Sequence, residues 1–519
     1  MADVTAEGQH MPAAVTDAPG SQATDTEAVP QDPPRDQAAR EEAPQEPAGA
    51  RRGIRALIAR HRVFSVAIAA AAVLRVMVML GYWPIMWYND SYSYVGDAVH
   101  ASPDFVRPDG YPLMLYVLMP LHSFAVVAAL QAMGGLAMGT GIYAVLRRRG
   151  LPGWGATLLT LPALFDVFEL QIEHMVMADA LFAFLVTMVV VVICWSDRLS
   201  VPLAAGIGLV TGYAGVVRSV GLPLIAVIAV CLVLRRVGWR AVTALLVAGV
   251  TPIAGYMVWF HARDGQYAIT ESSGVYLLSR VSSFAECSKI KLPPDLRVLC
   301  DPRPPSQRSN SQEYLWDGST PMFGVSNGDP FTPKWNSLTG QFAERAILAQ
   351  PADYIRVVAM DTLRTFSWTR ASSDVAGSGK SFQFRDVANT IPPWTYGRLD
   401  ASVRRYGRTM SQSGVRQPWA HLLEGYEKYF YLRGPLLAVI VLVGAGGVVA
   451  RWRRLGGVVL LPWAVGALLI ILPPATAGFS YRYALTAVPA VCLAAGLSLT
   501  EGAWAPLLAR MRKNKASDT

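Results

Sequence analysis

The chain has 519 residues and a net charge of +9; 52% of its residues are hydrophobic and only 16% are charged. Such a composition is typical of a membrane protein and excludes an ordinary soluble domain. The basic residues lie beside apolar segments and form no separate basic patch, so we expect no DNA or RNA partner.

The first segment, residues 1–50, contains ten acidic residues against two arginines and is rich in Pro, Ala, Gln and Thr. This composition predicts a disordered acidic tail, because such a segment cannot bury enough apolar surface to fold. The first apolar segment begins only near Val63, too far from the start for a signal peptide. We therefore expect a retained signal anchor, with the tail in the cytoplasm.

Ten apolar segments have roughly the length of about 20 residues that a membrane-spanning helix needs. They are residues 63–83, 122–146, 154–171, 176–195, 200–217, 219–234, 241–260, 434–450, 457–473 and 484–505. Clusters of Lys and Arg beside them all fall on one side if successive segments alternate in direction, which marks that side as cytoplasmic. The prediction is a mostly α-helical, polytopic plasma-membrane protein with about ten spans and both termini in the cytoplasm.

This topology divides the chain into regions. We expect an N-terminal transmembrane module at 51–260 with about seven spans and outer loops at 83–121 and 165–175. An extracytoplasmic domain of mixed structure follows at 261–433, then about three transmembrane helices at 434–505 and a basic cytoplasmic tail at 506–519. The first outer loop predicts interfacial helices. The helical spacing of apolar residues in 340–368 predicts a pair of amphipathic helices, and such helices can lie on a membrane surface.

Five cysteines are too few for a fold held together by disulfides. Cys194, Cys231 and Cys492 lie in apolar runs, where we expect them to act as small packing residues. Cys287 and Cys300 lie in the long polar region. They are candidates for a disulfide if that region faces an oxidising compartment.

The first outer loop begins with "WYNDSYSYVGDAVHASPDFVRPDGYP" at 87–112. Asp90 stands where the first span leaves the bilayer, although Asn89, Asp90 or Ser91 can equally be a helix cap. Asp97 follows seven residues later, about two helical turns, so both carboxylates would share one helix face. The pair is a candidate base or cation site, or else a solvated face. Arg107 is a candidate phosphate ligand.

The second outer connector, "FDVFELQIEHMVMADALF", places titratable side chains at the ends of two apolar helices, where each is costly without a partner. They are Asp166, Glu169, Glu173, His174 and Asp179. His and carboxylate together can bind a divalent ion. The spacing matches no strong metal signature, however, and an interfacial histidine with an ordinary hydrogen bond remains the alternative.

Two arginines have the same property as these acidic groups. Arg218 lies between two short apolar segments, and Arg482 lies next to the last one. Each is a costly cation unless it meets a carboxylate or a phosphate. The alternative for both is that the side chain extends to the outer interface.

With these motifs the chain resembles the C-type integral-membrane glycosyltransferases, which include protein O-mannosyltransferases, lipid A aminoarabinose transferases and actinobacterial arabinosyl and mannosyl transferases. "YNDSYSY" and "FELQIEHMVMADALFAF" stand at the places of the two acidic outer loops. "YPLMLYVL" resembles the interfacial helix, "GVVRSVGLPL" the basic turn and "SYRYALTAVPAVCLAAG" the start of a late helix. The resemblance spans about 55–505. Many relatives have Asp-Glu where this chain has Asp90 and Ser91.

The resemblance implies transfer of a sugar from a polyprenyl-phosphate donor, at the outer face of a bacterial plasma membrane, to an envelope glycan, lipid or protein. Asp90 would be the base, with Asp97 in reserve. The residues for the donor phosphate would be Arg218, Arg482 and Arg107. The residues that would shape the acceptor site, or hold a divalent ion as in some relatives, are Asp166, Glu173 and His174. No other cofactor is implied.

Two other classes share parts of this pattern. A polysaccharide polymerase or ligase, with a lipid-diphosphate donor, also has about ten spans and one large outer loop, but it relies on Arg and His in that loop. A transporter would place ionisable groups near the bilayer midplane. The central parts of the spans here are nearly free of charge, so the glycosyltransferase is favoured. The sugar and the acceptor stay open.

Overall fold

The computed structural model describes residues 58–368, 383–384, 398–408 and 414–500. These residues belong to one compact unit. The predictions for the tails at 1–50 and 506–519 concern segments outside the described residues. The described part consists of helices and one small antiparallel sheet, in which β1 (Tyr82–Trp83) pairs with β2 (Gly414–Val415).

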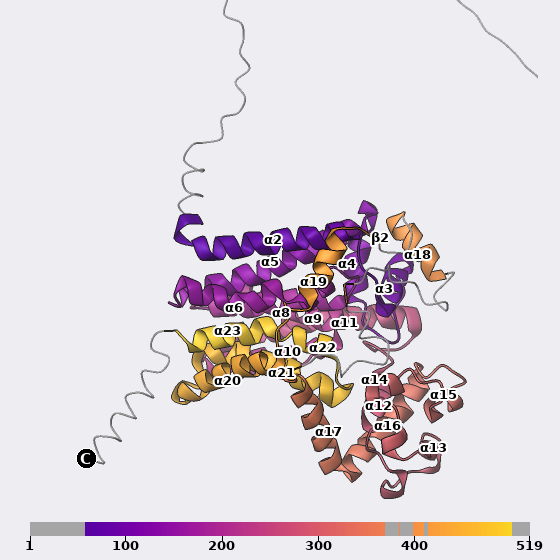
Figure 1. Ribbon diagram of the computed structural model, residues 1–519. Coiled ribbons are helices and arrows are strands. Elements are labelled where there is room, and N and C mark those ends of the chain that lie inside the picture. The colour runs from indigo at the N-terminus through magenta and orange to yellow at the C-terminus, as the bar shows by residue number, and fades with distance from the viewer. Residues whose placement is uncertain (1–57, 369–382, 385–397, 409–413, 501–519) are drawn as a thin grey trace, which may run out of the picture. The chain divides into compact units, whose positions relative to one another are not determined.

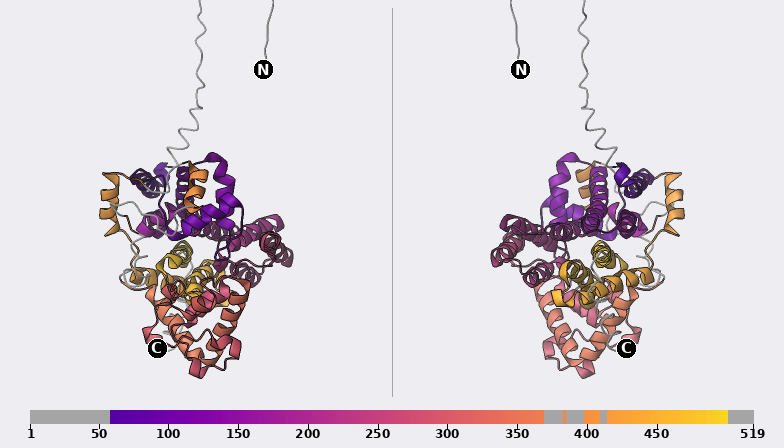
Figure 2. Two further views of the ribbon diagram at one scale, coloured as in Figure 1. Left: turned by 90° about the vertical axis from the view of Figure 1, so that its right-hand side faces the viewer. Right: turned by 90° about the vertical axis from the view of Figure 1, so that its left-hand side faces the viewer.

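The helices before the large outer region are α2 (Arg62–Gly81), α3 (Asn89–His100), α4 (Gly110–Leu118), α5 (Phe124–Arg148), α6 (Gly153–Phe165), α7 (Val167–Glu173), α8 (Ala178–Trp195), α9 (Val201–Val217), α10 (Leu224–Leu234) and α11 (Trp239–Asp264). Those after it are α20 (Gly434–Ala450), α21 (Leu460–Thr476), α22 (Tyr481–Leu485) and α23 (Val488–Ser498). Figure 1 shows that the long members of both groups run side by side, and Figure 2 shows them nearly end-on. Together they form a helix bundle.

The outer region contains α12 (Ser273–Val281), α13 (Pro294–Arg297), α14 (Ser311–Tyr314), α15 (Pro321–Val325), α16 (Pro333–Ala349), α17 (Pro351–Arg364), α18 (Arg398–Gly407) and α19 (Trp419–Glu427). Single 3-10 turns connect elements at η1 (Met119–Leu121), η2 (Ser219–Gly221), η3 (Cys287–Lys289), η4 (Pro305–Gln307), η7 (Trp452–Arg454) and η8 (Gly457–Val459). The interfacial helices predicted for the first loop correspond to α3 and α4. The predicted amphipathic pair corresponds to α16 and α17.

Five helices in the described residues are long and apolar enough to cross a membrane, so the chain is a multi-pass membrane protein. They are Arg62–Gly81, Phe124–Arg148, Ala178–Trp195, Trp239–Asp264 and Gly457–Thr476. Helices α6 and α7, bent by 53° at Asp166, make a sixth span if they are taken together. The remaining predicted segments also contain helices, but these are shorter. The total of ten spans therefore stays a prediction.

Close helix contact in the bundle depends on small residues. A Cβ added at Gly212 of α9 would lie 2.0 Å from the carbonyl oxygen of Gly249 in α11. Only glycine permits this approach of two backbones, and small residues at helix interfaces are typical of membrane proteins, where packing drives association. The α9–α11 pair is consequently held by backbone-to-backbone contact.

The outer region is not one domain of mixed structure with the boundaries 261–433. Residues from α12 to α17 share a core of their own, centred on Leu278, Phe342 and Ala346. Beyond α17 the described residues return to the bundle, because their apolar side chains are buried there: Tyr406 of α18 in the main core and Leu423 of α19 beside α2. In the described part of this region the only strand is β2, so its structure is helical.

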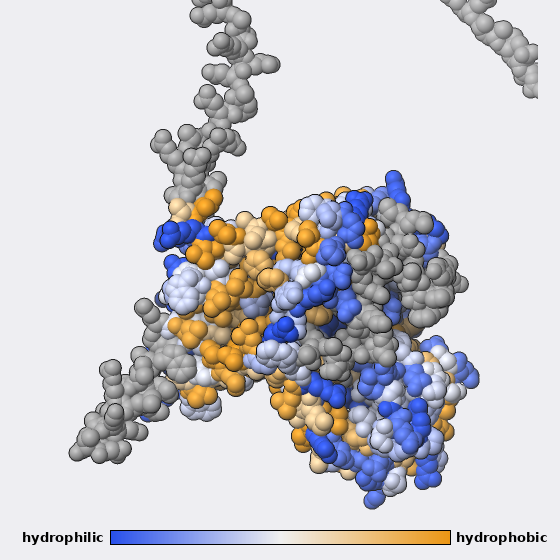
Figure 3. Space-filling model, viewed as in Figure 1, coloured by the Kyte–Doolittle hydropathy of each residue, from blue (hydrophilic) through white to orange (hydrophobic). Residues whose placement is uncertain are grey.

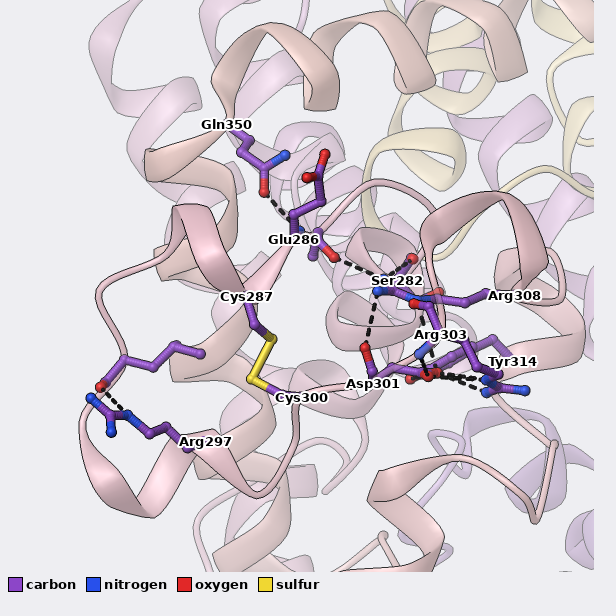
Figure 4. The surroundings of a disulfide bond; sticks show 12 residues. Ser282, Glu286, Cys287, Arg297, Cys300, Asp301, Arg303, Arg308, Tyr314 and Gln350 are labelled. Carbon is purple, nitrogen blue, oxygen red and sulfur yellow. Dashed lines mark hydrogen bonds and ion pairs between the residues drawn. A yellow bond between two sulfur atoms is a disulfide. The ribbon is translucent and has the colours of Figure 1, made fainter.

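The disulfide between Cys287 and Cys300 lies in the α12–α17 core, with a Cα–Cα distance of 6.1 Å. On one side of it, as Figure 4 shows, Asp301 accepts hydrogen bonds from Arg303 (Nη2–Oδ2 2.7 Å). Arg308 donates to the carbonyl oxygens of Ser282 and Ala285, both at 2.8 Å. These bonds fix the long loop that carries the second cysteine.

Candidate active site

Asp90 lies in the first turn of α3, directly after the first span and β1. Helix α3 is capped by Ser91, whose hydroxyl oxygen accepts a hydrogen bond from the backbone N–H of Tyr88 at 2.9 Å. The Asp90 carboxylate is therefore not used as the cap. It is buried, with 6% of its surface exposed. A carboxylate in a first helical turn is favoured by the helix dipole, but a buried one also needs a cationic partner.

Arginines from distant parts of the chain supply that partner. Nη2 of Arg107, in the loop after α3, lies 2.7 Å from Oδ1 of Asp90. Nη1 of Arg482, in α22, lies 3.1 Å from Oδ2. Arg218, at the break after α9, pairs with Asp179 of α8 and adds its attraction to Asp90. The structure thus brings together four of the residues named from the sequence: Asp90, Arg107, Arg218 and Arg482.

The arginines decide the charge of Asp90. Burial by itself would raise the pKa of its carboxyl group, but the attraction of Arg107 and of Arg482 outweighs burial and lowers that pKa below the ordinary 3.8. Asp90 is therefore ionised at neutral pH. The arginine side chains are partly exposed: the exposed fractions are 19% for Arg107, 17% for Arg218 and 16% for Arg482.

Aromatic rings line the arginines. The Arg482 guanidinium lies 5.3 Å from the ring centre of Tyr88 and 5.1 Å from that of Tyr483. Arg218 also faces Tyr483, at 5.0 Å. A cation over an aromatic face is stabilised electrostatically, so the rings hold the guanidinium groups in place without neutralising them.

Two residues of the outer region belong to the same surroundings. Trp316 lies under the Arg107 guanidinium, with 5.9 Å to the ring centre. The pKa of Tyr276 in α12 is raised, first by burial, and its hydroxyl interacts with Arg107, Asp90 and Arg482. Neither residue could be identified from the sequence, because isolated aromatic side chains far along the chain are ordinary core residues.

Asp97 does not join Asp90 between the arginines. Its carboxyl group interacts with Asp104 and Asp109 and, more weakly, with Arg107. Burial, followed by repulsion from these two acidic groups, raises the pKa of Asp97 to about 9. Burial also raises the pKa of Asp109, to about 7, and Oδ2 of Asp109 accepts a hydrogen bond of 2.7 Å from the Tyr256 hydroxyl. Asp97 is thus protonated at neutral pH and unsuited to be a base there.

The titratable side chains of the second connector make structural contacts. Asp166 caps α7 by accepting from the N–H of Phe168 at 2.8 Å, and His174 Nε2 bonds the carbonyl oxygen of Tyr82 at 2.8 Å. Glu173 pairs with Arg75. In the part of the chain that the structure describes, no group of three His, Cys, Asp or Glu side chains is placed to hold a metal ion. The contacts of Asp166, Glu173 and His174 give no support to a divalent-ion site, which stays a prediction.

Arg75 is the charged residue that the sequence reasoning missed. It lies within the first span, and its Nε and Nη2 donate to the two carboxylate oxygens of Glu173, both at 2.7 Å. The two side chains are 4% and 3% exposed. Gly135 of α5 makes room for them, because a Cβ there would lie 1.8 Å from Glu173 Oε1. This pair is a closed structural contact.

No protein-family model and no curated protein matches the sequence. Solved structures to which the chain is similar include the protein O-mannosyltransferase complex of S. cerevisiae bound to the sugar donor, at 15% identity and a TM-score of 0.32 over 46% of this chain and 37% of that chain. ArnT from Cupriavidus metallidurans bound to undecaprenyl phosphate matches at 14% identity and a TM-score of 0.33, over 84% of this chain and 77% of that one. The apo state of the same protein matches at 15% identity and a TM-score of 0.33, over 85% of this chain and 78% of that one. The first of these is a mannosyltransferase by name. At such TM-scores the likeness carries no argument about this chain's site.

Proposed function

We propose that the protein transfers a sugar from a polyprenyl-phosphate donor to an acceptor hydroxyl at the outer face of the plasma membrane. The observation that carries the proposal is the ionised, buried Asp90 in contact with Arg107 and Arg482. The side chains of both arginines and of the nearby Arg218 are partly exposed. A lipid-linked donor suits this position, because its chain can stay among the helices while its phosphate reaches the arginines at the interface.

In this mechanism Asp90 accepts the proton of the acceptor hydroxyl as the hydroxyl oxygen attacks the anomeric carbon. The bond from that carbon to the phosphate oxygen breaks, and polyprenyl phosphate leaves with the bonding electrons. Arg107, Arg218 and Arg482 would stabilise the charge that develops on the phosphate. Guanidinium groups are suited to this role because they can grip a phosphate with two parallel hydrogen bonds.

The ion pairs of the free protein have a further consequence for the base. While Arg107 and Arg482 contact Asp90, its lowered pKa makes it a weak base. A donor phosphate that engages these two guanidinium groups would weaken their contact with Asp90 and raise its pKa. General-base catalysis is most effective when the pKa of the base lies near the working pH. Donor binding would therefore prepare Asp90 for proton transfer.

The proposal extends to topology and acceptor. With Asp90 at the outer side, both termini lie in the cytoplasm and the α12–α17 region lies outside, where Trp316 and Tyr276 approach the arginines. An acceptor that comes from the cell envelope, whether glycan, lipid or protein, would then contact the site from this region.

The test uses membranes that contain the full chain and a radiolabelled polyprenyl-phosphate sugar. Asp90→Asn keeps the size of the side chain but cannot take up the proton, so we expect transfer to fall by about 100-fold or more. Asp295→Asn, at an exposed position of α13, is the matched control and should retain activity. Unchanged transfer by Asp90→Asn would refute the base assignment. Turnover only with a lipid-diphosphate donor would favour a polymerase or ligase instead.

A further inference from the structure

Helix α17 buries an acidic side chain and exposes several apolar ones. Asp361 is buried and its Oδ2 accepts from Nη1 of Arg280, which is 1% exposed, at 2.6 Å. On the opposite side Ile355 and Leu363 are 65% and 66% exposed. A helix on a soluble domain normally buries its apolar face. The reversed arrangement requires something apolar outside the chain to cover α17.

The exposed apolar residues form one continuous stripe. It comprises Leu348 at the end of α16 and Ala352, Ile355, Ala359 and Leu363 of α17, all exposed. Steps of three and four residues place the four α17 members on one side of that helix. Figure 3 shows hydrophobic surface over α17 on the side that it shares with the hydrophobic flank of the bundle. We call this set the α17 stripe.

Two contacts with the bundle fix the position of α17 relative to the ends of the membrane helices. The Tyr354 hydroxyl donates to the carbonyl oxygen of Ala475, at the end of α21, at 3.0 Å. A Cβ on Gly434, the first residue of α20, would lie 2.2 Å from the carbonyl oxygen of Ser367, so the chain after α17 touches the start of α20. Both contacts hold α17 where membrane helices end.

Side chains near these contacts are those of a membrane–water interface. Trp368 and Tyr429 are 63% and 75% exposed, and the Arg433 guanidinium lies 5.6 Å from the Trp368 ring centre. Exposed Trp and Tyr beside the end of a span are typical anchors at the lipid headgroups. The residues around α17 therefore indicate that this helix lies at the depth of the lipid headgroups.

The charge on the exposed side of α17 also suits a lipid surface. Its exposed positions carry Arg356 and Arg364 and no acidic residue, whereas Asp361 is turned inward. Arg364 forms an ion pair with Asp361, with 2.7 Å from its Nη1 to Oδ1, and this pair neutralises part of its charge. Arg356 lies directly beside the stripe. Basic residues along the edge of an apolar helix face favour anionic headgroups.

We propose that α17 lies on the outer leaflet of the bilayer, with the α17 stripe among the acyl chains and Arg356 at the level of anionic lipid headgroups. The outer region is then attached to the membrane at two places, through the bundle and through α17. This inference goes beyond sugar transfer and rests on the proposed function only for the choice of the outer leaflet.

The test places a fluorescent nitrobenzoxadiazole label on the full chain in lipid nanodiscs, at Ile355→Cys or Leu363→Cys. Glu344→Cys, at an exposed position of α16, is the matched control. The native cysteines do not interfere, since three are buried and two are bonded. A quencher on the lipid chains should reduce fluorescence at 355 and 363 by at least about twofold more than at 344, and aqueous iodide should show the opposite order.

Equal iodide quenching at 355 and 344 would overturn the proposal, because it would show the stripe in water. Protection at 355 from both quenchers would also overturn it, since a second copy or another protein would then cover the stripe. A second comparison tests the headgroup. Arg356→Gln should weaken lipid quenching at 363 in discs that contain phosphatidylglycerol and leave it unchanged in pure phosphatidylcholine. An equal effect in both discs would refute the anionic preference.

Discussion

The Asp90 site and the Arg75–Glu173 pair are two carboxylate–guanidinium contacts beside the same first span, with opposite access to solvent. In the Arg75–Glu173 pair both side chains are almost fully buried, and Gly135 closes the space around them. At Asp90 the carboxylate is equally buried, but the arginines that reach it are between 16% and 19% exposed. The Asp90 site offers cations to a ligand, and the Arg75 pair does not.

This difference shows how a structural ion pair is distinguished from a candidate site. Both carboxylates satisfy the rule that a charge among apolar helices needs a partner. In the closed pair one arginine and one carboxylate satisfy each other in a two-bond contact. At Asp90 two arginines, Arg107 and Arg482, contact one carboxylate. Arg218 pairs with Asp179, and Asp104 lies 3.7 Å from Arg107. Because these arginine side chains are partly exposed, an anionic ligand can replace a carboxylate as their partner.

Breaking the closed pair should have the largest effect. Arg75→Met leaves the Glu173 carboxylate buried without its cation, which costs about 3–5 kcal/mol of stability. We expect the detergent-purified protein to lose most of its folded population or to unfold at a much lower temperature. The double variant Arg75→Met, Glu173→Leu should recover most of the loss, because an apolar pair leaves no charge unpaired. A double variant as unstable as the single one would contradict this account.

Removing a cation of the open site should act on function instead. Arg482→Gln takes away one of the contacts to Asp90 and to the donor phosphate, and we expect about 100-fold slower transfer from a polyprenyl-phosphate donor. Its thermal unfolding should change far less than that of Arg75→Met, since Arg107 still neutralises Asp90. Arg482→Lys should restore only part of the rate, because an ammonium group lacks the fork of a guanidinium. A large loss of stability with unchanged transfer would reverse the assignment of the two contacts.

The residues of the Asp90 site could be predicted from the sequence better than the Arg75–Glu173 pair, for physical reasons. Asp90, Arg218 and Arg482 stand at the ends of apolar segments and Arg107 stands in a polar loop, where a charge is conspicuous in the sequence. Arg75 is one residue inside a long apolar run and does not interrupt the hydropathy that identifies the span. A pattern in the sequence thus finds charges at helix ends and overlooks a charge that its partner hides in the interior.

Asp97 shows a second limit of the sequence. Seven residues of helix keep two side chains on one face but separate them by about 10 Å along the axis. Asp97 therefore shares a helix with Asp90, but its carboxyl group is influenced more by the charges of Asp104 and Asp109 than by Arg107. Helical segments can be predicted from apolar runs, whereas the contacts of Trp316 and Tyr276 with the arginines depend on how distant segments pack.

A smaller change to the closed pair tests how tightly it is packed. Gly135→Ala adds a methyl group where Glu173 Oε1 lies, 1.8 Å from the Cβ position. Alanine favours a helix over glycine, which offsets part of the clash, so we expect a net loss of about 1–2 kcal/mol. Gly255→Ala is the control, because a Cβ there meets nothing within 4 Å. Thermal unfolding of both variants measures the difference, and equal stability would mean that Glu173 can move aside freely.

The smallest expected effect is that of replacing Asp97. The pH dependence of this effect distinguishes the acidic cluster of Asp97, Asp104 and Asp109 from the Asp90 site. Burial raises the pKa of Asp97 from 3.8 to about 9 in the folded protein. Between these two values the unfolded chain loses the proton and the folded chain keeps it, so this group lowers stability as the pH rises. Asp97→Asn removes the penalty. We expect the variant to gain about 1–3 °C in unfolding temperature over the wild type at pH 8 and less at pH 5.

Asp90, whose pKa is lowered, has the opposite sign: its contribution to stability is present at neutral pH and is lost on acidification, through the range below 3.8. An Asp97→Asn gain that is larger at pH 5 than at pH 8 would therefore mean that Asp97, like Asp90, is ionised and paired in the folded protein.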